Sequence, residues 1–152
     1  MRRQEMPIKT TGRNDSRREQ FGLDDKFVEI DGEQFAGLHL LLELWGAGRL
    51  DDEGHIEKSL LRAAEKAGAT VLDIRLHRFA SSGGVTGVAL LAESHISIHT
   101  WPERGYAAID IFMCGDCDAY QAVDPLEQAF TPMQMEIKEN RRGRQMGNAQ
   151  AG

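Results

Sequence analysis

The sequence predicts an α+β domain, a two-layer sandwich of a mainly antiparallel sheet with helices on one face. Short runs of alternating or β-branched apolar residues, separated by turn residues, outnumber the helical segments. Only residues 50–70 show a long and clear helical period. Many short strands with few helices favour helices packed against one side of a sheet.

Ordered structure is expected to begin after residue 26. Asp31-Gly32 lies between two short apolar runs and predicts a hairpin turn. Residues 38–45 (LHLLLELW) are a strand candidate, although leucine also supports a helix. Residues 50–70 predict a helix, because acidic residues crowd its start and Gly68 stands at its C-terminal cap. Its apolar face holds Ile56, Leu60, Ala63, Ala64 and Ala67.

The second half of the domain reads as strands with one short helix. In residues 70–79, Leu72, Ile74 and Leu76 alternate with polar side chains, which is typical of a half-buried strand. Glycine-rich residues 80–84 predict a turn. Further strands are expected at 85–92, 95–101 and 106–114, a short helix at 124–130 and an edge strand at 133–139.

The chain has 152 residues, enough for one domain with a sizeable core. Residues 1–26 are polar and predict a disordered arm, residues 27–144 the domain, and residues 145–152 a frayed tail. A net charge of −6 argues against a general nucleic-acid binder. The chain has no apolar run of about 18 residues, so no membrane span is expected. Two cysteines without a secretory signal suggest reduced thiols in a cytoplasmic protein.

Residues 91–117 contain several reactive side chains, and two common kinds of site could explain them: a zinc site or a hydrolase triad. A zinc site would use His95, His99, Cys114 and Cys117. The two histidines, however, are four positions apart on a predicted strand, about 13 Å, so we expect no metal site. A hydrolase triad on Ser94 lacks the Gly-x-Ser-x-Gly elbow. Packing alone explains any single residue of this cluster better than it explains the whole.

Several stretches together carry a family resemblance: GLHLLLELWGA, GAT…HRF, GGVTGVALLAESHISIHTWPERGYAAIDIFMCGD and RRGR. They resemble the bacterial S-adenosylmethionine decarboxylase proenzymes over residues 36–144. The most specific part is Glu-Ser-His with the downstream His, Trp-Pro-Glu and Cys-Gly.

The resemblance implies that the chain cuts itself between Glu93 and Ser94. The Ser94 hydroxyl attacks the Glu93 carbonyl, converting the amide to an ester, and elimination then releases the Glu93 carboxylate. The dehydroalanine left behind then tautomerises, and its hydrolysis by water releases ammonia and leaves a pyruvoyl group, the cofactor. The products are a β chain, residues 1–93, and an α chain, residues 94–152. A substrate amine forms a Schiff base with the pyruvoyl group, which accepts electrons as carbon dioxide leaves.

The resemblance also implies roles for single residues. His99, with Thr86 nearby, matches the processing region, and Cys114 matches the proton donor of decarboxylation. Cys117 has no counterpart and is read as incidental. Phe79 matches the family's aromatic residue that stacks on the adenine of the substrate. Trp101 and Glu103 match the region that contacts adenine and ribose. Glu43 matches a family acid near the active site, whose negative charge would suit the sulfonium cation.

The implied partners are S-adenosylmethionine and a second copy of the chain, because family protomers pair and complete each site together. The implied product is the aminopropyl donor for spermidine synthesis. Residues 79–87 hold one residue more than the usual family loop, which leaves substrate identity more open than pyruvoyl chemistry. Decarboxylation of an amino acid such as arginine or ornithine is the alternative activity. A homologue that never cleaves and acts by binding a partner is a second alternative.

Overall fold

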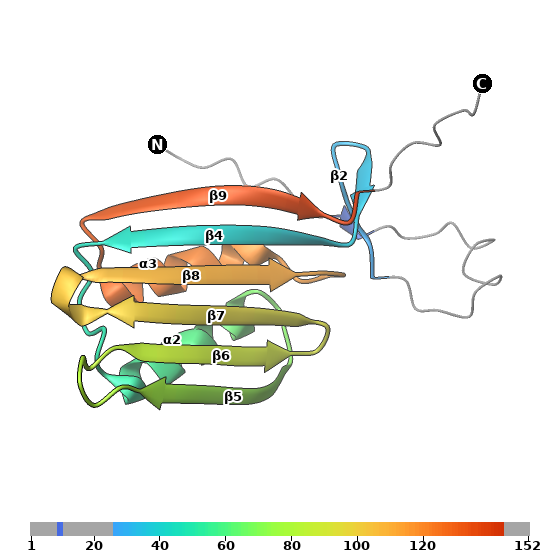
Figure 1. Ribbon diagram of the computed structural model, residues 1–152. Coiled ribbons are helices and arrows are strands. Elements are labelled where there is room, and N and C mark those ends of the chain that lie inside the picture. Colours follow the sequence, from blue (N-terminus) through green and yellow to red (C-terminus); the bar gives the residue numbers. More distant parts are fainter. Residues whose placement is uncertain (1–8, 11–25, 145–152) are drawn as a thin grey trace, which may run out of the picture.

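The computed structural model describes residues 9–10 and 26–144 (Figure 1). The predicted arm, residues 1–26, therefore lies outside the described residues except at Lys9, Thr10 and Lys26. The predicted tail, residues 145–152, lies wholly outside them. The division of the chain into arm, domain and tail stays a prediction.

A six-stranded antiparallel sheet forms one layer of the domain, with strand order β5-β6-β7-β8-β4-β9 (Figure 1). Its strands are β4 (Gly37–Trp45), β5 (Val71–Arg78), β6 (Val85–Leu91), β7 (Ser94–Trp101), β8 (Tyr106–Met113) and β9 (Gln134–Arg142). The other layer holds α2 (Glu53–Lys66) and α3 (Val123–Phe130), with the short 3-10 helix η2 (Ala119–Ala122). A second 3-10 helix, η1 (Pro102–Arg104), connects β7 to β8 at the end of the sheet. Both α-helices lie on one face of the sheet, which confirms the predicted two-layer α+β sandwich.

Helix α2 forms where the sequence predicts it. The Asp52 carboxylate accepts a hydrogen bond from the backbone N–H of His55 at 3.0 Å and so caps the first turn. The helix buries the predicted apolar residues against the sheet, and Gly68 follows it with a φ of 78°, a conformation that suits glycine. No helix within residues 9–10 and 26–144 is long and apolar enough to cross a membrane.

Strand alternation gives the six-stranded sheet two different faces. Ile96, Ile98 and Ile111 point toward the helices and are fully buried. Their neighbours on the same strands, such as His95 and Asp110, point to the other side, because successive side chains of a strand alternate. We call this second side, which α2 and α3 do not cover, the open face.

The prediction that Leu72 shares the buried face with Ile74 and Leu76 is wrong. The pairing of β5 with β6 has a bulge between Val71 and Asp73, and Leu72 is 62% exposed. An extra residue at a bulge shifts the side-chain alternation, so Val71 takes the inward position.

A smaller sheet of order β1-β2-β3 precedes the large one. It contains β1 (Lys9–Thr10), β2 (Val28–Ile30) and β3 (Glu33–Phe35). Asp31 and Gly32 form the predicted hairpin turn with φ values of 54° and 77°. Two consecutive positive φ values are typical of the tight turn that matches strand twist, and glycine takes the second without strain.

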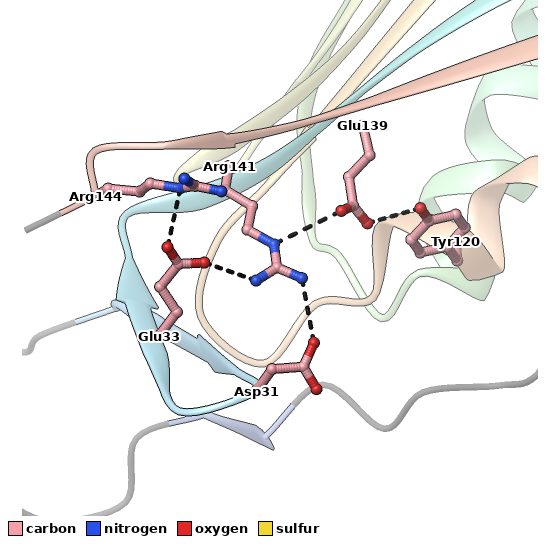
Figure 2. A network of polar contacts seen from close by, with 6 residues as sticks. All are labelled: Asp31, Glu33, Tyr120, Glu139, Arg141 and Arg144. Carbon is pink, nitrogen blue, oxygen red and sulfur yellow. Dashed lines mark hydrogen bonds and ion pairs between the residues drawn. The ribbon is translucent and has the colours of Figure 1, made fainter.

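Arg141 on β9 fixes this hairpin to the large sheet (Figure 2). Its guanidinium donates to Glu33 at 2.7 Å and to Asp31 at 3.4 Å, and it pairs with Glu139 at 3.6 Å. The same group lies 5.5 Å from the ring centroid of buried Phe35. Hydrogen bonding to Glu33 raises the pKa of Arg141 further, so its charge is secure. The network therefore joins residues more than a hundred positions apart in sequence.

We predict that Arg141→Ala loosens the hairpin, because three carboxylates then face one another without the central cation. The free energy of unfolding should fall by about 1–3 kcal/mol. Amide hydrogen exchange in residues 28–35 should accelerate more than in β7 or β8. Arg144→Ala is the matched control, since Arg144 is 58% exposed and makes one ion pair with Glu33. Its loss should cost less than about 1 kcal/mol. Equal effects of the two substitutions would contradict this account of the hairpin.

Candidate active site

The turn between β6 and β7 holds the Glu93–Ser94 bond. Leu91 pairs with Ser94, so Ala92 and Glu93 form a two-residue connection. Glu93 has a φ of 66°, a left-handed conformation that costs a non-glycine residue about 1–3 kcal/mol. Ser94 opens β7 with its side chain on the helix-covered side, where the residue is only 6% exposed. The bond thus joins a strained, exposed residue to a buried hydroxyl.

Cys114 lies against both sides of this bond. Its thiol donates to the Glu93 carbonyl oxygen at 2.7 Å, and its sulfur lies 3.6 Å from the Ser94 Oγ. The backbone N–H of Cys114 donates to the same Oγ at 3.2 Å. Because the thiol hydrogen points to Glu93, the Ser94 hydroxyl is left to donate to the sulfur. A continuous path for a proton therefore runs from the Ser94 hydroxyl through the thiol to the carbonyl.

Backbone geometry explains why Cys114 reaches this place. Strands β7 and β8 pair antiparallel with His95 opposite Phe112, so the end of β8 lies beside the start of β7. A turn follows at once, in which the Cys117 N–H donates to the Cys114 carbonyl at 3.4 Å. Gly115 supplies a φ of 62°, and its N–H donates to the Lys26 carbonyl at 2.7 Å. These bonds hold the cysteine loop in position.

Cys117 points away from the Glu93–Ser94 bond. Its thiol donates to the Gly68 carbonyl at 3.5 Å, at the end of α2. Burial, together with the nearby Cys114 and Asp116, raises the pKa of the Cys117 thiol. The two cysteines of the Cys-x-x-Cys spacing thus face different surroundings. Among the described residues, the candidate zinc ligands His95, His99, Cys114 and Cys117 form no common cluster.

A second group of expected site residues lies at the other end of β7. One surface pocket is lined by Phe79, Thr86, His99, Trp101 and Glu103, together with four neighbouring residues. His99 Nδ1 lies 3.1 Å from the Thr86 hydroxyl, because the two residues pair directly across β6 and β7. Phe79 and Trp101 are 47% and 39% exposed and so offer free aromatic surface. The structure therefore gathers most of the expected substrate contacts.

Glu43 lies next to this group on the open face. It accepts a hydrogen bond from the Tyr106 hydroxyl, and burial together with this contact raises the pKa of Tyr106 to about 12. The Tyr106 ring stacks between Trp45 and Trp101, with centroid distances of 4.3 and 5.2 Å. Sequence reasoning missed Trp45 and Tyr106. In the sequence, both are aromatic residues next to a glycine, Gly46 or Gly105, at the end of an expected strand. That pattern does not predict the ring stack, which depends on the pairing of Tyr106 with Trp45 and with Trp101 across three strands.

The two groups are separate within one chain. Ser94 and His99 are five residues apart on β7, about 17 Å along the strand. An odd spacing also places them on opposite faces of the sheet. The structure thus brings Glu93, Ser94 and Cys114 together at one end of β7. It brings a second group together at the other end, which consists of Phe79, His99, Trp101 and Glu103. The two groups do not meet within one chain.

We predict slow alkylation of Cys117. Thiolate is the reactive form, and a raised pKa means less thiolate at a given pH. We would follow the rate of iodoacetamide labelling by mass spectrometry in a Cys114→Ala chain, in which Cys117 is the one remaining thiol. At pH 9.0, the ordinary thiol pKa, this rate should be less than half of the maximum that it reaches at high pH. The same chain unfolded in urea is the control and should reach half of its plateau near that pH. Identical profiles for the folded and unfolded chain would contradict the burial argument.

Comparison with known proteins shows which family this chain is similar to. The family model described as S-adenosylmethionine decarboxylase matches residues 38–143. An S-adenosylmethionine decarboxylase proenzyme of Methanococcus maripaludis is 47% identical over 110 residues, 70% of this chain and 89% of that protein. One from Synechococcus is 57% identical over 82 residues, 53% of this chain and 63% of that protein.

A solved structure of the same family is also similar to this chain. The crystal structure of the adenosylmethionine decarboxylase from Aquifex aeolicus is 34% identical, with a TM-score of 0.63, over 78% of this chain and 98% of that one. The match of the family model covers the large sheet, both helices and the two residue groups described above. The chain belongs to the S-adenosylmethionine decarboxylase family.

Proposed function

We propose that this chain is a proenzyme that cuts itself between Glu93 and Ser94 and then acts as a carboxy-lyase on S-adenosylmethionine. The product would be the aminopropyl donor for spermidine synthesis, made in the cytoplasm. The observation that carries the proposal is the contact of Cys114 with both the Ser94 hydroxyl and the Glu93 carbonyl oxygen. Family membership supports the reaction, and this contact supplies its local chemistry.

Self-cleavage would begin with attack of the Ser94 Oγ on the Glu93 carbonyl carbon. The new C–O bond replaces the C–N bond, so the amide becomes an ester, and the nitrogen of residue 94 becomes an amine by taking up the proton that the hydroxyl loses. The Cys114 thiol donates to the oxygen on which negative charge develops, and its sulfur accepts the hydroxyl hydrogen. Breaking the peptide bond also releases the strain of the left-handed Glu93.

The surroundings of Ser94 fit a pyruvoyl group formed from this residue. The position is buried, and it already receives the Cys114 backbone N–H and faces the Cys114 sulfur. When present, the pyruvoyl group supplies a carbonyl that binds the substrate amine and accepts electrons as carbon dioxide leaves. Cys114 would hold a proton beside this position and return it to the substrate α-carbon. Its N–H would hold an oxygen at residue 94 in place.

The second group of residues would bind the nucleoside and the cationic sulfur. Exposed Phe79 and Trp101 offer faces on which adenine can stack, worth about 0.5–1.5 kcal/mol for each contact beyond area burial. Glu103 would accept hydrogen bonds from ribose hydroxyls. The Glu43 carboxylate beside the Trp45–Tyr106–Trp101 stack suits a sulfonium cation.

We further propose a homodimer in which each site takes residues from both chains. Within one chain, His99 is too far from Ser94 to assist it. Two copies paired through their open faces in opposite directions would bring the partner subunit's His99 to the end of β7 where exposed Glu93 precedes Ser94. Because the Ser94 side chain lies on the covered side, the partner subunit's His99 would approach the bond from the Glu93 side. The open face also exposes Trp45, Val88, Leu90 and Trp101 by 37–51%, more apolar surface than an isolated sheet face needs. A second copy of the chain would cover it.

Three variants test the cleavage step. Ser94→Ala should remain one chain on denaturing mass analysis, because the nucleophile is gone. Cys114→Ala should still cleave, but about tenfold more slowly, since it loses a hydrogen bond of about 1.4 kcal/mol to the reacting carbonyl. Once cleaved, it should also decarboxylate poorly, because residue 94 has lost its proton source. Cys117→Ser is the matched control and should behave as wild type. Wild-type cleavage and turnover by Cys114→Ala would remove the role assigned to this thiol.

Mixing two inactive chains tests the shared site. Ser94→Ala and His99→Ala should each cleave poorly or not at all when expressed alone. Coexpression should restore cleavage of the His99→Ala chain, because its intact Glu93–Ser94 bond would lie beside the partner subunit's His99 supplied by the Ser94→Ala chain. Two tags of different mass identify which chain is cut. Absence of rescue, with dimers present in sedimentation, would show that both residues must act from the same chain.

A further inference from the structure

A cluster on the open face takes no part in the proposed reaction. His39 on β4 and His95 on β7 both direct their Nε2 atoms at one carboxylate oxygen of Asp110 on β8, at 2.9 and 3.3 Å. One ligand atom from each of the three residues lies within 4.8 Å of the others. His95 follows Ser94 in the chain but points to the opposite face of the sheet, so the cluster is distinct from the Ser94–Cys114 group.

Strand register holds the three side chains in place. Phe112 lies between His39 and His95 in one row across β4, β8 and β7, and Asp110 is two residues away on the same face. The Phe112 ring centroid is 5.7 Å from each imidazole and forms an apolar wall. The side chains of His39, Asp110 and His95 are 16%, 25% and 39% exposed. Ligands on three hydrogen-bonded strands are well suited to hold a fixed geometry.

We propose that His39, His95 and Asp110 bind a divalent transition metal ion of the Zn²⁺ class, with the remaining coordination position directed to the open face. Two imidazoles and a carboxylate are favoured ligands of such ions. Metal–ligand bonds of about 2.0–2.2 Å place neighbouring ligand atoms about 3.3 Å apart in a tetrahedral site. The two ligand distances at Asp110 are already near this value.

Arg142 opposes metal binding. Its guanidinium lies 3.2 Å from His39 Nδ1 and can only donate, so Nδ1 accepts and the ring hydrogen sits on Nε2, facing Asp110. A metal on Nε2 requires that hydrogen to move to Nδ1, which then needs an acceptor rather than a cation. Arg142 is exposed on the edge strand β9 and is free to turn toward solvent. Replacing it should therefore tighten metal binding.

Zn²⁺ titration of the full chain by calorimetry, with Co²⁺ absorption as a second readout, tests the site. One equivalent per chain should bind. His39→Ala and Asp110→Asn should each weaken binding more than about tenfold, the loss that even outer-shell changes commonly cause. His77→Ala is the matched control and should bind as wild type, because His77 is exposed on β5, at the far edge of the same sheet. Arg142→Gln should bind severalfold more tightly, a gain that failed folding cannot produce.

A further control must distinguish zinc bound by the cluster from zinc bound by the two cysteines. The Cys114→Ser/Cys117→Ser chain should retain the equivalent, because neither thiol belongs to the cluster. Binding lost in that chain but kept in Asp110→Asn would assign the ion to the thiols and overturn the proposal. No saturable binding by the wild-type chain would overturn it as well. Neither result would bear on the proposed decarboxylase activity, because cleavage at Glu93–Ser94 is measured separately by mass spectrometry.

Discussion

Only one face of the six-stranded sheet is covered by helices, and this constraint decides where each functional group can lie. Along β7 the alternation of side chains sends Ser94 to the covered side, and His95, His99 and Trp101 to the open face. Burial of Ser94 keeps its hydroxyl in a fixed contact, whereas exposure of Trp101 leaves a surface for ligand or partner. A single chain therefore offers two partial sites, and their separation favours a second copy as the missing component.

The cleavage chemistry depends on two turns that lie side by side at one end of the sheet. The β6–β7 turn forces Glu93 into a left-handed conformation, and the loop after β8 delivers Cys114 to the same bond. Pairing of β7 with β8 fixes the two turns relative to each other. The reacting groups are thus held by backbone hydrogen bonds rather than by long flexible side chains, as an efficient intramolecular reaction requires.

The fold class, the helix after Asp52 and the hairpin at Asp31 were predictable, because each rests on local periodicity or turn chemistry. Leu72 was misplaced because a bulge depends on the partner strand, which a single strand pattern does not show. The family was predictable from specific motifs such as Glu-Ser-His. The separation of Ser94 from His99 follows from strand spacing, but the Trp45–Tyr106 stack and the His39–Asp110–His95 cluster do not. Those contacts join β4 to strands more than fifty residues later, so only the register reveals them.

The most direct test of the account is an intact-mass spectrum of the wild-type chain after incubation with S-adenosylmethionine and cyanoborohydride. Reduction traps a substrate amine on a carbonyl, so one spectrum reports both cleavage and substrate. The account predicts two fragments separated at Glu93–Ser94, with an adduct derived from S-adenosylmethionine on the second. The same cleavage with an adduct only from arginine or ornithine would contradict the substrate. A single uncut chain without adduct would contradict the proenzyme itself.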